Sequence, residues 1–270
     1  GDLTRQIANA HTLFNVVNTI IFIPFIPLYA KLLTKIVKGK EEEEIEYLPK
    51  YLEKHLLNTP PIAIEAAIKE TIRTLGLTQK MVSLAMNSFF SNDSKSLEKI
   101  TQGEEAVDSL REAITNYLVE LMQRELSAEE SRKIPPLIHA INDVERIGDH
   151  AENLRDLVQQ KIDNRMPFSN TAIEELKKMY EDINQMVSCS INALKLNNVD
   201  EAKLVLEQEC QINTVRDRLK GNHVRRLEQG ECNVLSGVVF LDMISNLEKI
   251  GDHLTNVAQA VIEGLQWDGK

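Results

Sequence analysis

The hexapeptide Glu145-Arg-Ile-Gly-Asp-His150 occurs a second time in this 270-residue chain, as Glu248-Lys-Ile-Gly-Asp-His253. Five of the six residues are identical, and the two copies lie 103 residues apart. An asparagine follows each copy at the same distance, at Asn153 and Asn256. Such an internal repeat indicates that the body of the chain consists of two copies of one unit.

A second pair of related segments precedes the two hexapeptides. Glu104-Glu-Ala-Val-Asp108-Ser-Leu-Arg111 corresponds to Glu209-Cys-Gln-Ile-Asn213-Thr-Val-Arg216. Around both pairs the apolar residues recur at helical spacing, and no segment alternates as a half-buried strand would. We therefore predict six long helices, three in each unit, at residues 61–91, 95–126, 128–162, 171–197, 199–228 and 231–265.

Stop and start signals separate these helices. Ser127-x-x-Glu130, Thr171-x-x-Glu174 and Asn198-x-x-Glu201 resemble capping boxes, and Gly230 suits the turn after a helix. The chain has only 11 glycines and 8 prolines, as expected when few turns are needed. The predicted fold is all-α, with two tandem three-helix bundles.

Each hexapeptide places an acid four residues before another, so both lie on one helix face. Two such carboxylates repel each other by about 0.2–0.5 kcal/mol when exposed, and a bound cation would reverse the sign. Clustered carboxylate oxygens suit hard cations such as Mg²⁺, Mn²⁺, Ca²⁺ or iron. With the companion segments, the predicted metal ligands are Glu104, Asp108, Glu145, Asp149, Glu209, Asn213, Glu248 and Asp252.

Other interpretations of these residues stay open. A single pair of acids usually marks a solvated face or an ion pair with a neighbour such as Arg146 or Lys249, and it is the duplication that favours metal ligands. Asn213 stands where the first unit has Asp108 and brings no charge, so a site that uses it should be weaker. His150 and His253 lie about 100° around the helix from the acids, which favours packing between helices over ligation.

Composition and missing motifs exclude several classes of protein. A net charge of −10 opposes a nucleic-acid partner, which requires a basic face. Three dispersed cysteines do not form a disulfide framework or a thiolate zinc site. The Glu-x-x-His spacing of di-iron bundles is absent, as are the phosphate-binding loops and nucleophile elbows of common enzymes. We therefore do not expect an enzyme, and a di-metal hydrolase or oxidase is the weakest alternative.

The beginning of the chain has a different character. Residues 6–30 contain no Lys, Arg, Asp or Glu. A helix of this length would be long enough to cross a hydrocarbon core of roughly 30 Å. A basic collar of Lys31, Lys35, Lys38 and Lys40 follows, and the positive-inside rule then places the rest of the chain in the cytoplasm. A buried helix of a soluble protein is the alternative. We predict one transmembrane helix within residues 1–38, a linker at 39–60 and the helical domain at 61–270.

The repeated motifs resemble those of the PhoU family, bacterial regulators of phosphate uptake. Glu145/Asp149 and Glu248/Asp252 match the motif of that family, Glu104/Asp108 match its companion, and Glu209/Asn213 match the companion incompletely. The segment from Arg5 to Asn15 is similar to a late transmembrane segment of bacterial Na⁺/phosphate cotransporters. Residues 56–60 are similar to the junction found in cotransporters that carry a PhoU-like tail.

These resemblances imply the C-terminal part of a sodium-dependent phosphate cotransporter in the bacterial inner membrane, with residues 39–270 on the cytoplasmic side. Na⁺ and phosphate would be the transported ions, and a multinuclear cluster of iron, manganese, zinc, magnesium or calcium is expected in the tail. The expected partners are an upstream transporter domain, phosphate, membrane lipid and a second copy in a homodimer. The predicted wall of the transport path is Gln6, Asn9, His11, Asn15 and Asn18.

The main alternative is a free-standing PhoU-type adaptor that regulates a phosphate transporter or a sensor kinase. It shares the acidic motifs of the helical body but has no use for residues 6–30.

Overall fold

The computed structural model describes residues 3–26, 29 and 47–263, and it divides the chain into two compact units, Gly1–Glu44 and Ile45–Lys270. The first unit contains α1 (Leu3–Phe22) and a short 3₁₀ turn. The second begins with a strap, residues 47–53, and another 3₁₀ turn. Its long helices are α3 (Pro60–Ser91), α4 (Glu98–Leu121), α5 (Ala128–Asp163), α6 (Asn170–Leu196), α7 (Val199–Glu228) and α8 (Val234–Glu263).

The helix ends follow local capping chemistry. Ser127 and Glu130 form the predicted capping box at the start of α5, with each side chain bonded to the backbone N–H of the other. Asn198 caps α7 by accepting hydrogen bonds from the N–H groups of Asp200 and Glu201. At α6 the cap is Ser169, two residues before the predicted Thr171, and it accepts from the N–H of Ala172 at 3.2 Å. Gly230 takes the positive φ expected after α7.

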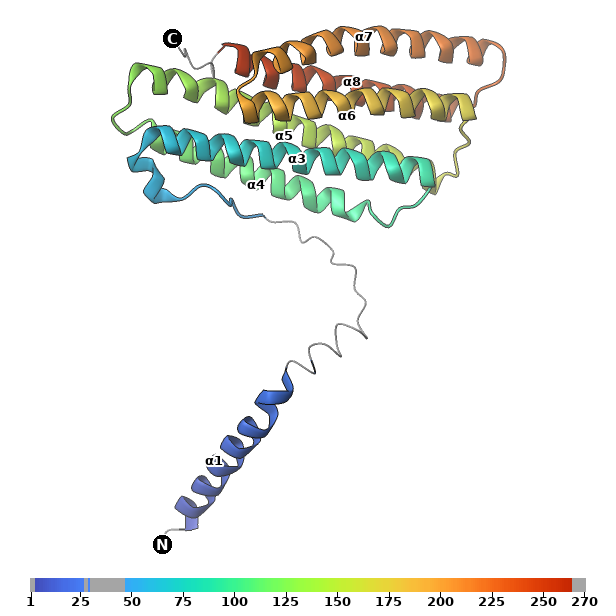
Figure 1. Ribbon diagram of the computed structural model, residues 1–270. Coiled ribbons are helices and arrows are strands. Elements are labelled where there is room, and N and C mark those ends of the chain that lie inside the picture. The colour runs from blue at the N-terminus through green and yellow to red at the C-terminus, as the bar shows by residue number, and fades with distance from the viewer. Residues whose placement is uncertain (1–2, 27–28, 30–46, 264–270) are drawn as a thin grey trace. The chain divides into compact units, whose positions relative to one another are not determined.

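The six long helices of the second unit form two groups of three that pack into one body (Figure 1). α3, α4 and α5 make the first half, and α6, α7 and α8 make the second. The halves meet where α5 packs along α8 and α3 packs along α6. One continuous apolar core runs through both halves. The all-α prediction is confirmed, and among the described residues there is no strand.

The mid-helix glycines of the two hexapeptides allow helices to approach closely. A Cβ on Gly148 would lie 3.3 Å from Cγ1 of Val107 on α4, and one on Gly251 would lie 3.4 Å from Cδ1 of Ile183 on α6. The close neighbour is therefore another helix in both cases.

The prediction of a transmembrane helix is wrong. α1 spans 20 residues, but Asn9, His11, Asn15 and Asn18 interrupt its apolar sequence, and the most apolar part falls where the helix ends near Pro24. Within the described ranges, no helix combines the length and the apolar character that crossing a membrane requires. The placement in the bacterial inner membrane depended on this helix and is corrected with it.

Candidate functional site

The first acid set consists of Glu104 and Asp108 on α4 and Glu145 and Asp149 on α5. The guanidinium of Arg111 connects the two helices, with Nη2 at 3.1 Å from Oδ1 of Asp108 and Nε at 3.9 Å from Oε1 of Glu145. Arg146 pairs with Asp149 at 3.0 Å. The fold therefore brings together the four acids that the sequence predicts for the first half.

The first acid set has four carboxylates and two contacting guanidinium groups, those of Arg111 and Arg146. Burial raises the pKa of Glu104, and the carboxylates of Glu152 and Asp108 raise it further. Burial also raises the pKa of Glu145, and Asp149 adds to that rise although Arg146 and Arg111 act against it. The nearby guanidinium groups thus leave part of the acidic charge uncompensated.

The second acid set consists of Glu209 and Asn213 on α7 and Glu248 and Asp252 on α8. Arg216 donates through Nη1 to both Glu248 and Asn213 Oδ1, the latter at 2.9 Å. Asn213 in turn donates to Glu209. Nζ of Lys249 lies 2.7 Å from Oδ2 of Asp252 and 3.6 Å from Oε2 of Glu248. These pairings give the second set a lysine or arginine partner at Glu248 and at Asp252.

Carboxylates are suitable ligands for a hard cation, so the chemistry of the first acid set fits one. The present side-chain positions do not form a finished site. Among the residues that the structure describes, no three His, Cys, Asp or Glu side chains are arranged to hold a metal ion. Arg111 and Arg216 lie beside the motif glutamates, where an ion would have to compete with them. The metal-ligand assignment stays a prediction.

Two histidines connect the halves as hydrogen-bonding packing residues. Nδ1 of His150 lies 2.9 Å from Oδ1 of Asn246, and Nδ1 of His253 lies 2.8 Å from Oδ1 of Asp143. The two rings are 5.5 Å apart between centroids. The sequence reasoning missed Asp143 and Asn246 as partners, although they are themselves 103 residues apart and so belong to the same repeat.

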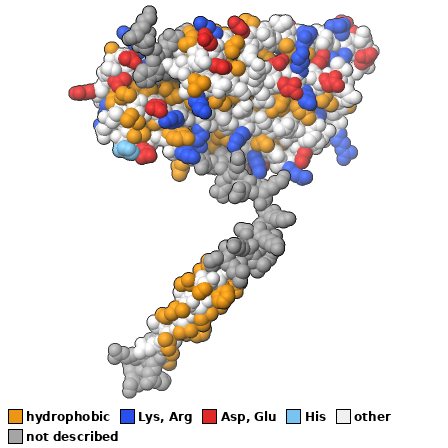
Figure 2. All heavy atoms as spheres, in the orientation of Figure 1, with side chains coloured by type: hydrophobic (Ala, Val, Ile, Leu, Met, Phe, Trp, Pro, Cys, Tyr) orange, Lys and Arg blue, Asp and Glu red, His pale blue; other side chains and the backbone are white. Residues whose placement is uncertain are grey.

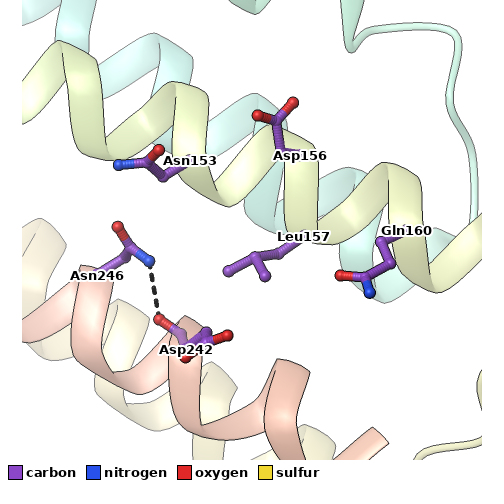
Figure 3. Close-up of a pocket in the computed structure, with 6 residues that line it drawn as sticks. All are labelled: Asn153, Asp156, Leu157, Gln160, Asp242 and Asn246. Atoms are coloured by element: carbon purple, nitrogen blue, oxygen red, sulfur yellow. Dashed lines mark hydrogen bonds between the residues drawn. The ribbon is translucent and has the colours of Figure 1, made fainter. Parts of the chain in front are cut away.

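A shallow groove of about 250 Å³ opens between α5 and α8 beside this contact (Figure 3). Asn153, Asp156, Leu157 and Gln160 line it from α5, and Asp242 and Asn246 line it from α8. Asn246 also donates to the backbone carbonyl of Asp242 at 2.9 Å. The lining contains amides and acids but no lysine or arginine, which makes it a poor site for an anion.

The predicted transport-path residues all fall on α1. Asn15 and His11 are hydrogen bonded to each other at 3.2 Å, and the hydroxyl of Thr19 donates to the carbonyl of Asn15. α1 is covered largely by apolar side chains (Figure 2). Nothing in this helix tests a role in transport, and the assignment stays a prediction.

Comparison with known proteins identifies relatives of the whole helical body. The model of the PhoU domain matches residues 71–158 and again 176–261. YjbB of Escherichia coli strain K12, a protein named for inorganic phosphate export, is 22% identical over 255 residues, which are 94% of this chain and 47% of YjbB. This chain thus spans about half the length of YjbB.

One further relative and one solved structure match the helical body over most of their own length. The phosphate-specific transport system accessory protein PhoU homolog of Clostridium acetobutylicum is 23% identical over 201 residues, or 74% of this chain and 90% of the relative. The crystal structure of PhoU from Pseudomonas aeruginosa has a TM-score of 0.70 and 21% identity, and the match covers 76% of this chain and 97% of that chain.

Proposed function

This chain belongs to the PhoU domain family, and on that premise we propose that it regulates a phosphate transport system. The names of its relatives support the proposal, because one is an accessory protein of phosphate-specific transport and another is named for phosphate export. The accessory-protein relative, which this chain matches over most of its length, favours the adaptor over the sodium cotransporter. The role is regulatory rather than catalytic, and the partner is a phosphate transport protein.

The excess of negative charge in the first acid set is the observation that carries the proposed mechanism. Glu104, Asp108, Glu145 and Asp149 would hold metal ions that accept carboxylate ligands, such as iron, Mn²⁺, Zn²⁺, Mg²⁺ or Ca²⁺. A bound cation would supply the positive charge that attracts phosphate to a face that otherwise repels it. Within this set, Arg111 contacts Asp108 on its own helix and Glu145 on α5.

The second acid set should bind a cation more weakly. Asn213 contributes no charge, so the second set offers one carboxylate fewer than the first. An arginine contacts the motif residues in both sets and does not by itself distinguish them. We therefore assign the ligand-sensitive role to the first half and a mainly structural role to the second.

Measurement of phosphate uptake in cells tests the regulatory role. A strain that lacks the gene for this chain should take up labelled phosphate faster than the parent, because a restraint on the transporter is removed. The wild-type gene and Glu248→Gln should restore normal uptake, whereas Glu145→Gln should not. Equal uptake in the parent and the deletion strain would exclude the proposed function.

A further inference from the structure

The strap, residues 47–53, is bound to α3 by a buried acid. Glu70 is 0% exposed and accepts hydrogen bonds from the backbone N–H groups of Lys50 and Tyr51, both at 2.8 Å. Arg73, one turn further along α3, donates to Glu70 at 2.5 Å and to the carbonyl of Leu48 at 3.0 Å. A buried carboxylate with this many charge-assisted partners is a strong anchor.

α4 holds the strap at both ends. The hydroxyl of Ser109 donates to the carbonyl of Tyr47 at 3.4 Å, and the hydroxyl of Tyr117 donates to the carbonyl of Glu53 at 3.3 Å. These two anchors are separated by about 12 Å of helix, at 1.5 Å per residue. Arg111, the residue that joins Asp108 to Glu145, lies between them in the sequence of α4.

The second half shows that the fold itself does not require a strap. Glu175 on α6 occupies the position of Glu70, 105 residues later, as Glu209 does for Glu104. It contacts α7 directly, accepting from Asn222 at 2.7 Å and pairing with Arg226 at 2.9 Å. Asn222 stands at the position of Tyr117. In the first half, therefore, the strap occupies a place that direct contacts between two helices fill in the second half.

We propose that the strap is a conformational link that reports the state of the first acid set to the chain preceding residue 47. The path is short, because Ser109 follows Asp108 directly on α4 and Arg111 binds both Asp108 and Glu145. A change at Glu145 alters its contact with Arg111 and so shifts the position of α4. That shift weakens the hydrogen bond from Ser109 to the strap. The second acid set has no equivalent connection, because Glu175 contacts Asn222 and Arg226 on α7 and not a strap. The link needs no bound cation and does not rest on the proposed function.

Hydrogen–deuterium exchange of the full chain, with peptides that cover residues 47–57, tests the link. Glu145→Gln should raise deuterium uptake in these peptides by about twofold, because it loosens the Ser109 anchor and favours local opening. The matched variant Glu248→Gln should leave the uptake unchanged. Asp108→Asn, which introduces the residue of the second half, should act like Glu145→Gln, and a thermal melt of each variant confirms that it is folded.

Two anchor variants sharpen the test. Glu70→Gln should raise uptake in the strap by itself, while Glu175→Gln should raise it only in α6 and α7. Ser109→Ala should remove the response, so that Ser109→Ala with Glu145→Gln exchanges like Ser109→Ala alone. An unchanged strap in both Glu145→Gln and Asp108→Asn, or an equal rise in Glu248→Gln, would overturn the proposal.

Discussion

The two halves of the helical body use the same three-helix plan but fill equivalent positions with different side chains. Leu118 on α4 and Ile134 on α5 are both fully buried. The corresponding residues of the second half are His223 on α7 and Gly237 on α8. Both are buried, and a Cβ added to Gly237 would meet the His223 ring. A large polar ring beside a glycine has replaced two apolar side chains. The comparison shows that the repeat keeps these two positions buried while both their chemistry and their side-chain volume change.

The polar residues have diverged in the same manner. A guanidinium spans the motif residues in both halves, from Arg111 in the first and from Arg216 in the second. The acids differ, because the first half has Asp108 where the second has the uncharged Asn213. The first half also carries the strap over α3 and α4, and the second has direct contacts from Glu175 in its place. The proposed function assigns ligand sensing to the first half and a mainly structural role to the second. The predictions below test this division, beginning with the largest effect.

Introducing the glycine of the second half at position 134 should have the largest effect. Ile134→Gly removes a fully buried side chain, which costs about 2–5 kcal/mol, and adds about 1 kcal/mol for a glycine within a helix. Urea denaturation should show a loss of this size in the free energy of unfolding. A loss below about 1 kcal/mol would mean that position 134 tolerates glycine, the residue at the equivalent position of the second half.

The reverse change should also destabilise the protein. A Cβ on Gly237 would lie 2.5 Å from Nε2 of His223, so Gly237→Ala must displace the ring. We expect a net loss of about 1–2 kcal/mol, because overpacking costs about 1–3 kcal/mol and the better helix former returns part of it. His223→Ala in the same chain should relieve the clash, which a double-mutant cycle in urea would detect as non-additivity. Additive losses would argue against direct contact.

The buried histidine should make stability fall in mild acid. Burial lowers the pKa of His223, and the guanidinium of Arg226 lowers it further against the opposing effect of Glu175. Because the pKa is lowered in the folded state, the stability that the neutral His223 ring contributes is fully present above the ordinary value of 6.5. It is lost as the pH falls from 6.5 through the lowered folded value.

Comparison with His223→Leu, the residue type of the first half, isolates this effect. Urea midpoints at about pH 7.5 and about pH 5.5 should differ more for the wild-type chain than for His223→Leu. Equal shifts in both proteins would place the pH dependence elsewhere.

The smallest expected effects are at the two mid-helix glycines. Gly251→Ala should stabilise the protein by about 0.5–1 kcal/mol, because alanine is the better helix former and its Cβ would make an ordinary contact at 3.4 Å. Gly148→Ala should gain less, since Val107 at 3.3 Å must move slightly. Thermal melts compare the two variants. A larger gain at position 148 would reverse the predicted order.

Local patterns account for the parts of the fold that the sequence predicts. Helical periodicity and caps act over a few residues, so each of the six long helices is predicted within a few residues, with Ser127 and Asn198 as caps. α1 is the exception. A run without charges predicts a membrane helix, but the asparagines and the histidine on α1 lower its hydropathy below what a span needs.

The site is less predictable because its partners are far apart in the sequence. The repeat predicts which acids share a helix face, but Arg111 and Arg216 reach their glutamates across a helix contact that no local pattern specifies. Glu70 is a single acid in an apolar helix sequence, and only the fold reveals that it holds the strap. Alignment of the two repeats would have found Asp143 and Asn246, since they occupy one repeat position.

Titration of the metal-free chain with Mn²⁺ by calorimetry tests the functional division of the two halves most directly. The wild-type chain should bind Mn²⁺, and Glu145→Gln should weaken the tightest site at least about tenfold, a change of about 1.4 kcal/mol. Glu248→Gln should change that affinity by less than about threefold. Equal weakening by both variants, or a wild-type chain that binds no Mn²⁺, would contradict the assignment of cation binding to the first acid set.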